Sequence, residues 1–303
     1  MNLDLIIASK IFIKFCLECL EKSRLSCHDP FKNTIMKKIV ILTGNEMRHT
    51  YFRFILSNND RFEVLASFCE GVEKSLESRT FSNIESSVLE KQHVLSRKQS
   101  EKDFFGAAVS NLIDNSNPVN INKGDINNSK IVEKIKHLNP DLLVCYGSSL
   151  IKSELLTEFE GRFLNVHLGL SPYYRGSGTN VWPLINKEPW MVGATFMYID
   201  SGIDTGRIIH QIQATISLGD SPHTIGNRLI IKMTKIYSEL VVNFDNLSNE
   251  VQPEAQGKLY KQADFDSTAC RVLYENFNNG MIEGYINNHE PKIYLVKNKT
   301  ISY

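Results

Sequence analysis

The sequence predicts an α/β protein built on a doubly wound, mostly parallel sheet, and three observations lead to that fold class. Short apolar runs rich in Val, Ile and Leu recur along the chain and end in glycine or a polar loop. Segments with apolar residues at helical spacing lie between these runs. Such alternation of strand and helix is typical of parallel sheets covered by helices on both faces. We expect a main domain at residues 36–245, a short N-terminal extension at 1–35, and a small helical or mixed C-terminal tail at 246–303.

The first expected strand lies at 36–44, where "MKKIVILTG" joins a basic flank to an apolar, β-branched run that ends in Thr-Gly. The next segment, "MRHTYFRFIL", has the apolar spacing of a helix, and "FEVLASFC" (62–69) has the composition of a second strand. Residues 70–100 are polar, which leaves a helical excursion and a mobile region both open. A helix that stops before Pro140 then leads into a buried strand, "LLVCYG" (142–147).

The second half begins with a short strand, "RFLNVHLG", followed by a glycine-rich loop. Two further strands, at 191–200 and 207–216, flank the tight turn "SGIDTG". A long helix follows, with Ser221 as its N-cap and Pro222 in its first turn. Its predicted buried stripe comprises Ile225, Leu229, Met233, Ile236 and Leu240.

Composition and charge favour an ordinary globular protein of the cytoplasm. The chain has 303 residues, of which 42% are apolar, and its 34 Lys and Arg are balanced by 34 Asp and Glu. A neutral chain has no general attraction for nucleic acid or for an anionic membrane. The apolar run "LIIASKIFIKF" is interrupted by Lys10 and Lys14 and falls short of the roughly 20 residues that span a bilayer. It also lacks the cleavage site of a signal peptide.

Three cysteines and a histidine cluster near the start of the chain, at Cys16, Cys19, Cys27 and His28. Cys-x-x-Cys is a usual half of a zinc site. The surrounding "IFIKFCLECLEK" nevertheless has amphipathic spacing, and free cysteine behaves as a small buried hydrophobe. We therefore favour packing over metal binding and leave the zinc alternative open.

Polar residues follow the predicted strands at the edge of the sheet where ligands bind in this fold class. After the first strand, "TGNEMRH" offers Asn45, Arg48 and His49 at a helix N-terminus. Backbone N–H groups at such an end attract anions, so the three residues are candidates for binding an anionic substrate. A solvated first turn of the helix explains the same residues equally well.

Asn165 and His167 share one face of a strand because strand side chains repeat every two residues, and Asp204 lies on the loop "DSGIDTG". An acyl transfer to an amine needs donors aimed at the developing oxyanion and groups that accept and deliver a proton. Asn, His and Asp supply these functions, and a carboxylate beside His167 would favour the cationic imidazole. The alternative is structural: Asn165 caps a strand, His167 satisfies a backbone carbonyl, and Asp204 shapes a turn.

The ordered pair of segments "NVHLGLSPYYRG" and "GATFMYIDSGIDTGRII" resembles the folate-dependent formyltransferases, which act on methionyl-tRNA, glycinamide ribonucleotide or sugar nucleotides. The resemblance covers roughly residues 36–245 and implies a Rossmann-like formyltransferase fold. It gives Asn165, His167 and Asp204 the catalytic roles. It also implies 10-formyltetrahydrofolate as the formyl donor, a primary amine as the acceptor, and no metal.

The same resemblance implies a pterin cleft lined by the backbone of two stretches of the chain, which contain Leu143, Cys145, Tyr146, Gly147, Tyr198, Asp200 and Gly202. Arg175 lies on the acceptor side, where we expect a structural rather than a catalytic role. Two departures from the family pattern stand out. Leu168 replaces the usual proline after the histidine, and the loop after the first strand has one glycine instead of a glycine-rich phosphate loop.

The acceptor is predicted by elimination. The resemblance implies that a methionyl-tRNA formyltransferase would carry an additional C-terminal barrel that helps to hold tRNA. Residues 251–303 have six Lys and Arg against six Asp and Glu, so this tail is too small and too neutral to bind a nucleic acid. Glycinamide ribonucleotide enzymes should show the glycine-rich loop. An amino sugar nucleotide is therefore the expected acceptor, with methionyl-tRNA formylation and hydrolysis of formyltetrahydrofolate as alternatives. We expect no membrane partner, and the tail leaves three roles open: covering the sheet edge, forming a homodimer, or closing over the acceptor.

Overall fold

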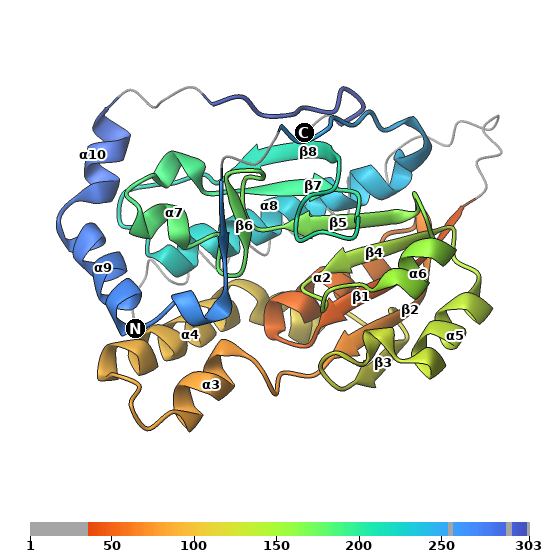
Figure 1. Cartoon of the computed structure of the whole chain (residues 1–303), viewed down its shortest axis with the longest axis horizontal. Helices are drawn as coiled ribbons and strands as arrows, with labels where there is room; N and C mark the ends of the chain where they lie inside the picture. The colour runs from red at the N-terminus through yellow and green to blue at the C-terminus, as the bar shows by residue number, and fades with distance from the viewer. Residues whose placement is uncertain (1–35, 254–256, 289–292, 302–303) are drawn as a thin grey trace. The chain divides into compact units, whose positions relative to one another are not determined.

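The computed structural model describes residues 36–253, 257–288 and 293–301 (Figure 1). The predicted extension, with its cluster of cysteines, lies outside the described residues. The division of the chain into extension, main domain and tail at positions 35 and 245 stays a prediction.

A seven-stranded sheet forms the centre of the protein, in the order β3-β2-β1-β4-β5-β7-β8. The first five strands of this order are parallel, while β7 runs antiparallel to both β5 and β8. The mostly parallel, doubly wound fold class is thus confirmed. The strands are β1 (Lys37–Gly44), β2 (Phe62–Glu70), β3 (Pro118–Ile121), β4 (Leu142–Tyr146), β5 (Phe163–His167), β7 (Gly193–Met197) and β8 (Ile208–Gln213).

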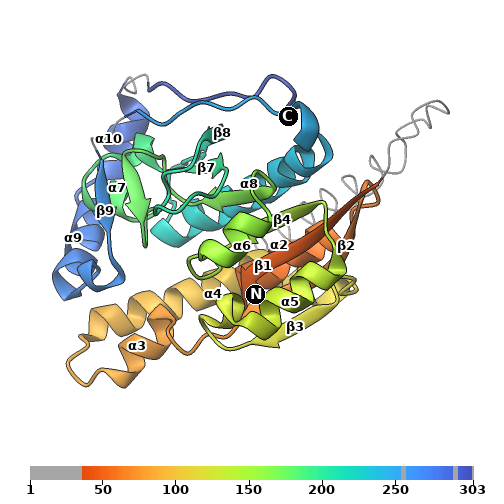
Figure 2. The same ribbon diagram turned by 45° about the vertical axis from the view of Figure 1, so that its right-hand side comes forward.

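Helices cover both faces of the sheet (Figures 1 and 2). The central strand β1 shows why: Ile39 and Ile41 face one hydrophobic cluster, and Val40 and Leu42 face the other. The first cluster is covered by α2 (Met47–Ser57), α4 (Val88–Asn111) and α8 (Pro222–Val242), and the second by α5 (Ser129–Leu138) and α6 (Ser153–Glu158). Both faces of a strand are therefore apolar, as expected for a buried parallel sheet.

The long helix α8 begins and packs as the sequence predicts. The Ser221 side chain accepts a hydrogen bond from the backbone N–H of Thr224, and Pro222 occupies the first turn. All five residues of the predicted stripe are buried. Tyr237, on the same helix, is fully buried and donates its hydroxyl to the Leu164 carbonyl of β5 at 2.5 Å. This contact anchors α8 to the strand that carries Asn165 and His167.

Residues 70–100 resolve in favour of a helical excursion, made of α3 (Leu76–Ser82) and the first half of α4. Ser87 and Glu90 form a reciprocal capping box at the start of α4. Two strands outside the main sheet, β6 (Tyr174–Gly176) and β9 (Lys258–Tyr260), pair in parallel. The remaining helices are α7 (Trp182–Ile185), α9 (Ser267–Asn278) and α10 (Met281–Asn287), with short 3-10 turns η1 (Asp125–Asn127), η2 (Pro189–Met191), η3 (Phe244–Asn246) and η4 (Gln262–Asp264).

The last described segment, 293–301, runs beside the edge strand β8 (Figure 1). The backbone N–H of Gln211 donates to the Val296 carbonyl at 2.8 Å, and Asn298 donates its N–H to His210 Nδ1 at 3.0 Å. The tail thus covers an edge of the sheet, which is one of its three predicted roles. Within the described ranges, every helix is too short or too polar to cross a membrane.

Candidate active site

A cavity of about 690 Å³ opens at the carboxyl ends of β1, β4 and β5. Its volume lies within the usual range for small-molecule sites, and its position is where doubly wound sheets bind ligands. Further walls come from the loops 176–181 and 198–206, from α3 and α4, and from the start of α8. The tail contributes Lys261, Gln262 and Phe265, so it also closes one side of the cavity.

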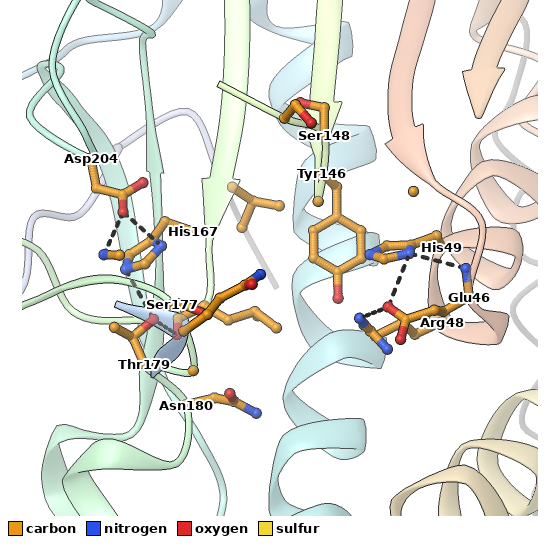
Figure 3. A pocket seen from close by; sticks show the side chains of 18 of the residues that line it. Glu46, Arg48, His49, Tyr146, Ser148, His167, Ser177, Thr179, Asn180 and Asp204 are labelled. Carbon is orange, nitrogen blue, oxygen red and sulfur yellow. Dashed lines mark hydrogen bonds and ion pairs between the residues drawn. The ribbon is translucent and has the colours of Figure 1, made fainter. Parts of the chain in front are cut away.

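Asn165 and His167 line this cavity from β5, as the spacing predicts. The Asn165 carboxamide forms no hydrogen bond with any described residue, so it does not cap the strand. His167 is buried and held from both ring nitrogens (Figure 3). Its Nε2 donates to the Tyr174 carbonyl at 2.8 Å, and its Nδ1 lies 3.3 Å from Oδ2 of Asp204. Both partners are oxygen acceptors, and an imidazole with a proton on each nitrogen satisfies both.

Asp204 reaches His167 from the loop after β7, although β7 runs antiparallel to β5 and its carboxyl end points away from the shared rim. The loop turns back toward His167 because its backbone conformation is held by specific contacts. Asp204 itself adopts a positive φ of 54°, which costs a non-glycine residue of order 1–3 kcal/mol. Its Oδ2 accepts the Gly176 N–H at 2.8 Å, and the Gln252 side chain donates to its carbonyl at 3.0 Å. Such strain persists where surrounding contacts hold it in place.

Thr179 completes the surroundings of the imidazole. Its hydroxyl lies 3.2 Å from His167 Nε2 and donates to the Leu168 carbonyl at 2.7 Å, so it accepts from the ring. Gly169 lies against the same nitrogen, because a Cβ at that position would come within 2.5 Å of His167 Nε2. Two residues that the sequence analysis did not select therefore fix the position of the ring. Gly169 lies within the motif that carries His167, but the motif does not show the contact, and Thr179 lies beyond the motif.

His49 faces the cavity from the opposite wall, beside Tyr146 (Figure 3). Burial lowers the pKa of His49 well below its usual value, and the neighbouring Arg48 lowers it further. The Glu46 N–H donates to His49 Nδ1 at 3.3 Å. Gly147 leaves room for the ring: it has a φ of +72°, and a Cβ there would lie 2.3 Å from His49 Nε2. His49 is thus a neutral, tightly enclosed side chain and supplies no positive charge for an anion.

Arg48 is already neutralised. Its guanidinium donates to Glu101 at 2.7 Å and also pairs with Glu46. Burial alone would lower the pKa of Arg48, but these carboxylates raise it above the ordinary value. Arg97 joins the same group through Glu101 at 3.2 Å and Glu46 at 3.4 Å, which gives two cations and two anions. Asn45 lines the cavity and lies 3.4 Å from the Asn120 side chain. The predicted anion site at this helix end therefore has little uncompensated positive charge.

Comparisons with known proteins bear on this arrangement. A family model described as "Formyl transferase" matches residues 64–241, which is more than half of the chain. The chain belongs to the formyl transferase family. This membership confirms the resemblance read from the sequence motifs and places Asn165, His167 and Asp204 within the matched region.

Among relatives of this formyl transferase is the methionyl-tRNA formyltransferase of Caldanaerobacter subterraneus subsp. tengcongensis, 31% identical over 157 residues that cover 48% of this chain and 50% of the relative. The corresponding protein of Thermodesulfovibrio yellowstonii is 36% identical over 112 residues, 36% of each chain. The chain thus spans about half the length of such relatives or less. The structure of a sugar N-formyltransferase from a Shewanella species matches with a TM-score of 0.50 and 18% identity. The match covers 80% of this chain and 88% of the Shewanella chain, and it shows the same fold.

Five of the seven residues predicted for the folate cleft of this formyl transferase line the cavity: Tyr146, Gly147, Tyr198, Asp200 and Gly202. The other two, Leu143 and Cys145, are not among the lining residues, and their place in the folate cleft stays a prediction. They alternate toward the opposite face of β4, where they are fully buried among residues of α5 and α6.

Arg175 also lies outside the lining, so the predicted substrate contact is not supported. It sits in β6, which pairs with β9, and its Nε is buried without a hydrogen-bond partner. Asp200 acts within its own loop: Oδ1 accepts from the Gly202 N–H at 3.0 Å and from the Thr205 hydroxyl at 2.7 Å. Its role in the described structure is to shape the turn that delivers Asp204.

Proposed function

We propose that this formyl transferase moves a formyl group from 10-formyltetrahydrofolate to a primary amine of a small metabolite, with an amino sugar nucleotide as the leading acceptor. The observation that carries the proposal is the group Asn165, His167 and Asp204, which line one wall of a cavity of small-molecule size. The free carboxamide of Asn165 favours a functional role for that residue, because a strand cap would use it, whereas His167 does satisfy a backbone carbonyl as the structural alternative expects.

Each residue has a task that follows from its contacts. Asn165 donates its amide N–H to the formyl oxygen as negative charge develops there. The His167 ring, held between Tyr174 and Asp204, adds a fixed positive charge when both nitrogens are protonated. Asp204, directly or through water, accepts the proton that the attacking amine loses and passes it toward the leaving nitrogen. None of these steps needs a covalent intermediate or a metal ligand from the protein.

A small acceptor is favoured because the tail walls the cavity through Lys261, Gln262 and Phe265. Methionyl-tRNA is the second candidate acceptor, favoured by the names of the sequence relatives. Both acceptors present a primary amine, so the same chemistry serves either.

The test is release of tetrahydrofolate from 10-formyltetrahydrofolate by the purified full chain. Release that depends on an added amine supports transfer, release without amine indicates hydrolysis, and no release under any condition refutes an enzymatic role. The amines are a panel of nucleotide-linked amino sugars, glycinamide ribonucleotide and methionyl-tRNA. If no sugar nucleotide raises turnover, the leading acceptor is wrong.

Variants connect the activity to the site. Asn165→Ala and His167→Ala should each lower kcat about 100- to 1,000-fold, since each removes stabilisation of the developing oxyanion. Asn111→Ala at the end of α4 and His137→Ala on the surface of α5 are matched controls far from the cavity lining. Retained activity in both site variants would refute the assignment.

A further inference from the structure

The charged side chains around the cavity divide into two groups. On the α2 side, Arg48 and Arg97 are balanced by Glu46 and Glu101, and Lys123 pairs with Glu70 at 2.9 Å. The carboxylates near the catalytic residues are also engaged, because Asp204 contacts His167 and Asp200 holds its own turn. These parts of the wall have no uncompensated positive charge.

Three other cations of the lining, Lys74, Arg79 and Lys261, form no ion pair with any described residue. Of the nearby carboxylates, one is paired elsewhere, one lies beside Lys261, and Glu73, next to Lys74 with its carboxylate against Gly71, forms no ion pair with a described residue. Glu77 pairs with Lys98 at 2.7 Å, and Asp264 accepts the backbone N–H of Lys261 at 2.8 Å.

Arg79 is the best defined of the three. Its Nη1 lies 3.5 Å from the Gln262 carbonyl, which brings α3 against η4 of the tail. Its Nε is buried and has no hydrogen-bond partner among the described residues. A buried donor left without a partner costs about 1–3 kcal/mol, so a ligand that accepts from it recovers that cost. The planar fork of a guanidinium matches two oxygens of a phosphate group.

We propose that Lys74, Arg79 and Lys261 form a binding site for the diphosphate of a nucleotide-linked acceptor. The inference rests on the proposed function, in which the amine of that acceptor lies beside Asn165 and His167 in the same cavity. Three cations match the two to three negative charges of a diphosphate better than the single charge of a carboxylate. The site also replaces the predicted anion site at Arg48 and His49, where the charge of Arg48 is compensated by carboxylates and His49 is uncharged.

The experiment measures binding of uridine 5′-diphosphate, inorganic pyrophosphate and inorganic phosphate to the full chain by calorimetry at constant ionic strength. We expect both diphosphates to bind more tightly than phosphate. Arg79→Gln and Lys261→Gln should each weaken diphosphate binding about 10- to 100-fold, the usual range for losing a charge-assisted hydrogen bond. Arg271→Gln is the matched control, because Arg271 pairs with Glu275 on the exposed side of α9 and should leave binding unchanged.

Each outcome decides between the two proposals. If wild-type protein binds neither diphosphate, or if both variants bind as wild type does, the diphosphate site is refuted, even where an uncharged amine still accelerates tetrahydrofolate release. If the variants lose diphosphate binding but no amine accelerates release, the site stands and the transferase proposal fails. Competition by methionyl-tRNA alone, without diphosphate binding, would make RNA the occupant and overturn the inference. Thermal unfolding of each variant separates lost binding from lost folding.

Discussion

An alanine at position 169 would push its methyl group into the imidazole of His167. A Cβ built there lies 2.5 Å from His167 Nε2, 2.6 Å from the Tyr174 carbonyl oxygen and 2.8 Å from Thr179 Cβ. These three atoms belong to the contacts that hold the ring in place. Gly169 therefore offers a steric test of the site that changes no polar group.

The magnitude follows from the distances. Ordinary contact with a Cβ begins near 3.4 Å, so the ring or the Tyr174 carbonyl must move by about 0.9 Å. A displacement of about 1 Å in a reacting group costs about 100-fold in rate. Overpacking at a buried position costs about 1–3 kcal/mol of unfolding free energy. We expect Gly169→Ala to lower kcat about 100-fold and the melting temperature by several degrees.

The assay is tetrahydrofolate release at saturating amine, with the affinity for 10-formyltetrahydrofolate measured separately by equilibrium binding. Gly106→Ala is the matched control: it lies inside α4, where a Cβ meets its nearest neighbour at 3.6 Å. This control should keep wild-type kcat and gain up to about 1 kcal/mol, because alanine favours a helix over glycine.

A folded Gly169→Ala protein with wild-type kcat would refute the reasoning, since catalysis would then tolerate a displaced imidazole. Loss of folate binding in parallel with kcat would also contradict it, because the clash lies at His167 and not in the predicted folate cleft.

Three further outcomes follow from the same contacts. Thr179→Val removes the hydroxyl beside His167 and should lower kcat about tenfold, as expected for one neutral hydrogen bond, while Thr179→Ser restores it. Asp204→Asn keeps an acceptor but removes the charge and the proton acceptor, so kcat should fall at least about 100-fold with acceptor KM little changed. Burial lowers the pKa of His93 to about 3 and that of His223 to about 4. Because the unfolded chain takes up these protons from about pH 6.5 and the folded chain does not, stability should fall with pH below 6.5. Each histidine should lower the free energy of unfolding by about 1.4 kcal/mol for each pH unit below 6.5. Urea titrations of the wild type and of His93→Gln at several pH values measure this loss.

Much of the fold follows from local patterns. The stripe of α8 and the strands that begin at 37, 62, 142 and 163 were predictable because apolar spacing directly records which face of an element is buried. Residues 70–100 were not, because α4 is a polar helix with few buried side chains, Phe105 among them, and so has no clear apolar stripe.

The site divides in the same way. Asn165 and His167 were predictable as a pair because the strand repeat of two residues fixes their common face. The compensation of the Arg48 charge was not, since Glu101 lies 53 residues away and meets it only through the packing of α4 on α2. Leu143 and Cys145 lie outside the cavity lining because they belong to the buried length of β4, whose carboxyl end alone reaches the cavity, at Tyr146.

The tail contacts the proposed active site and is more than a cover for the sheet edge. Gln252 donates to the carbonyls of both Asp204 and Gly206 at 3.0 and 2.7 Å, so it fixes the strained turn that presents the carboxylate to His167. Lys261 faces the cavity directly after β9, whose pairing with β6 sets its position. Disturbing the tail should therefore change both the acid-base chemistry at Asp204 and the recognition of the acceptor. A loop that follows an antiparallel strand needs such outside support, because the sheet alone directs Asp204 away from the rim where Asn165 and His167 lie.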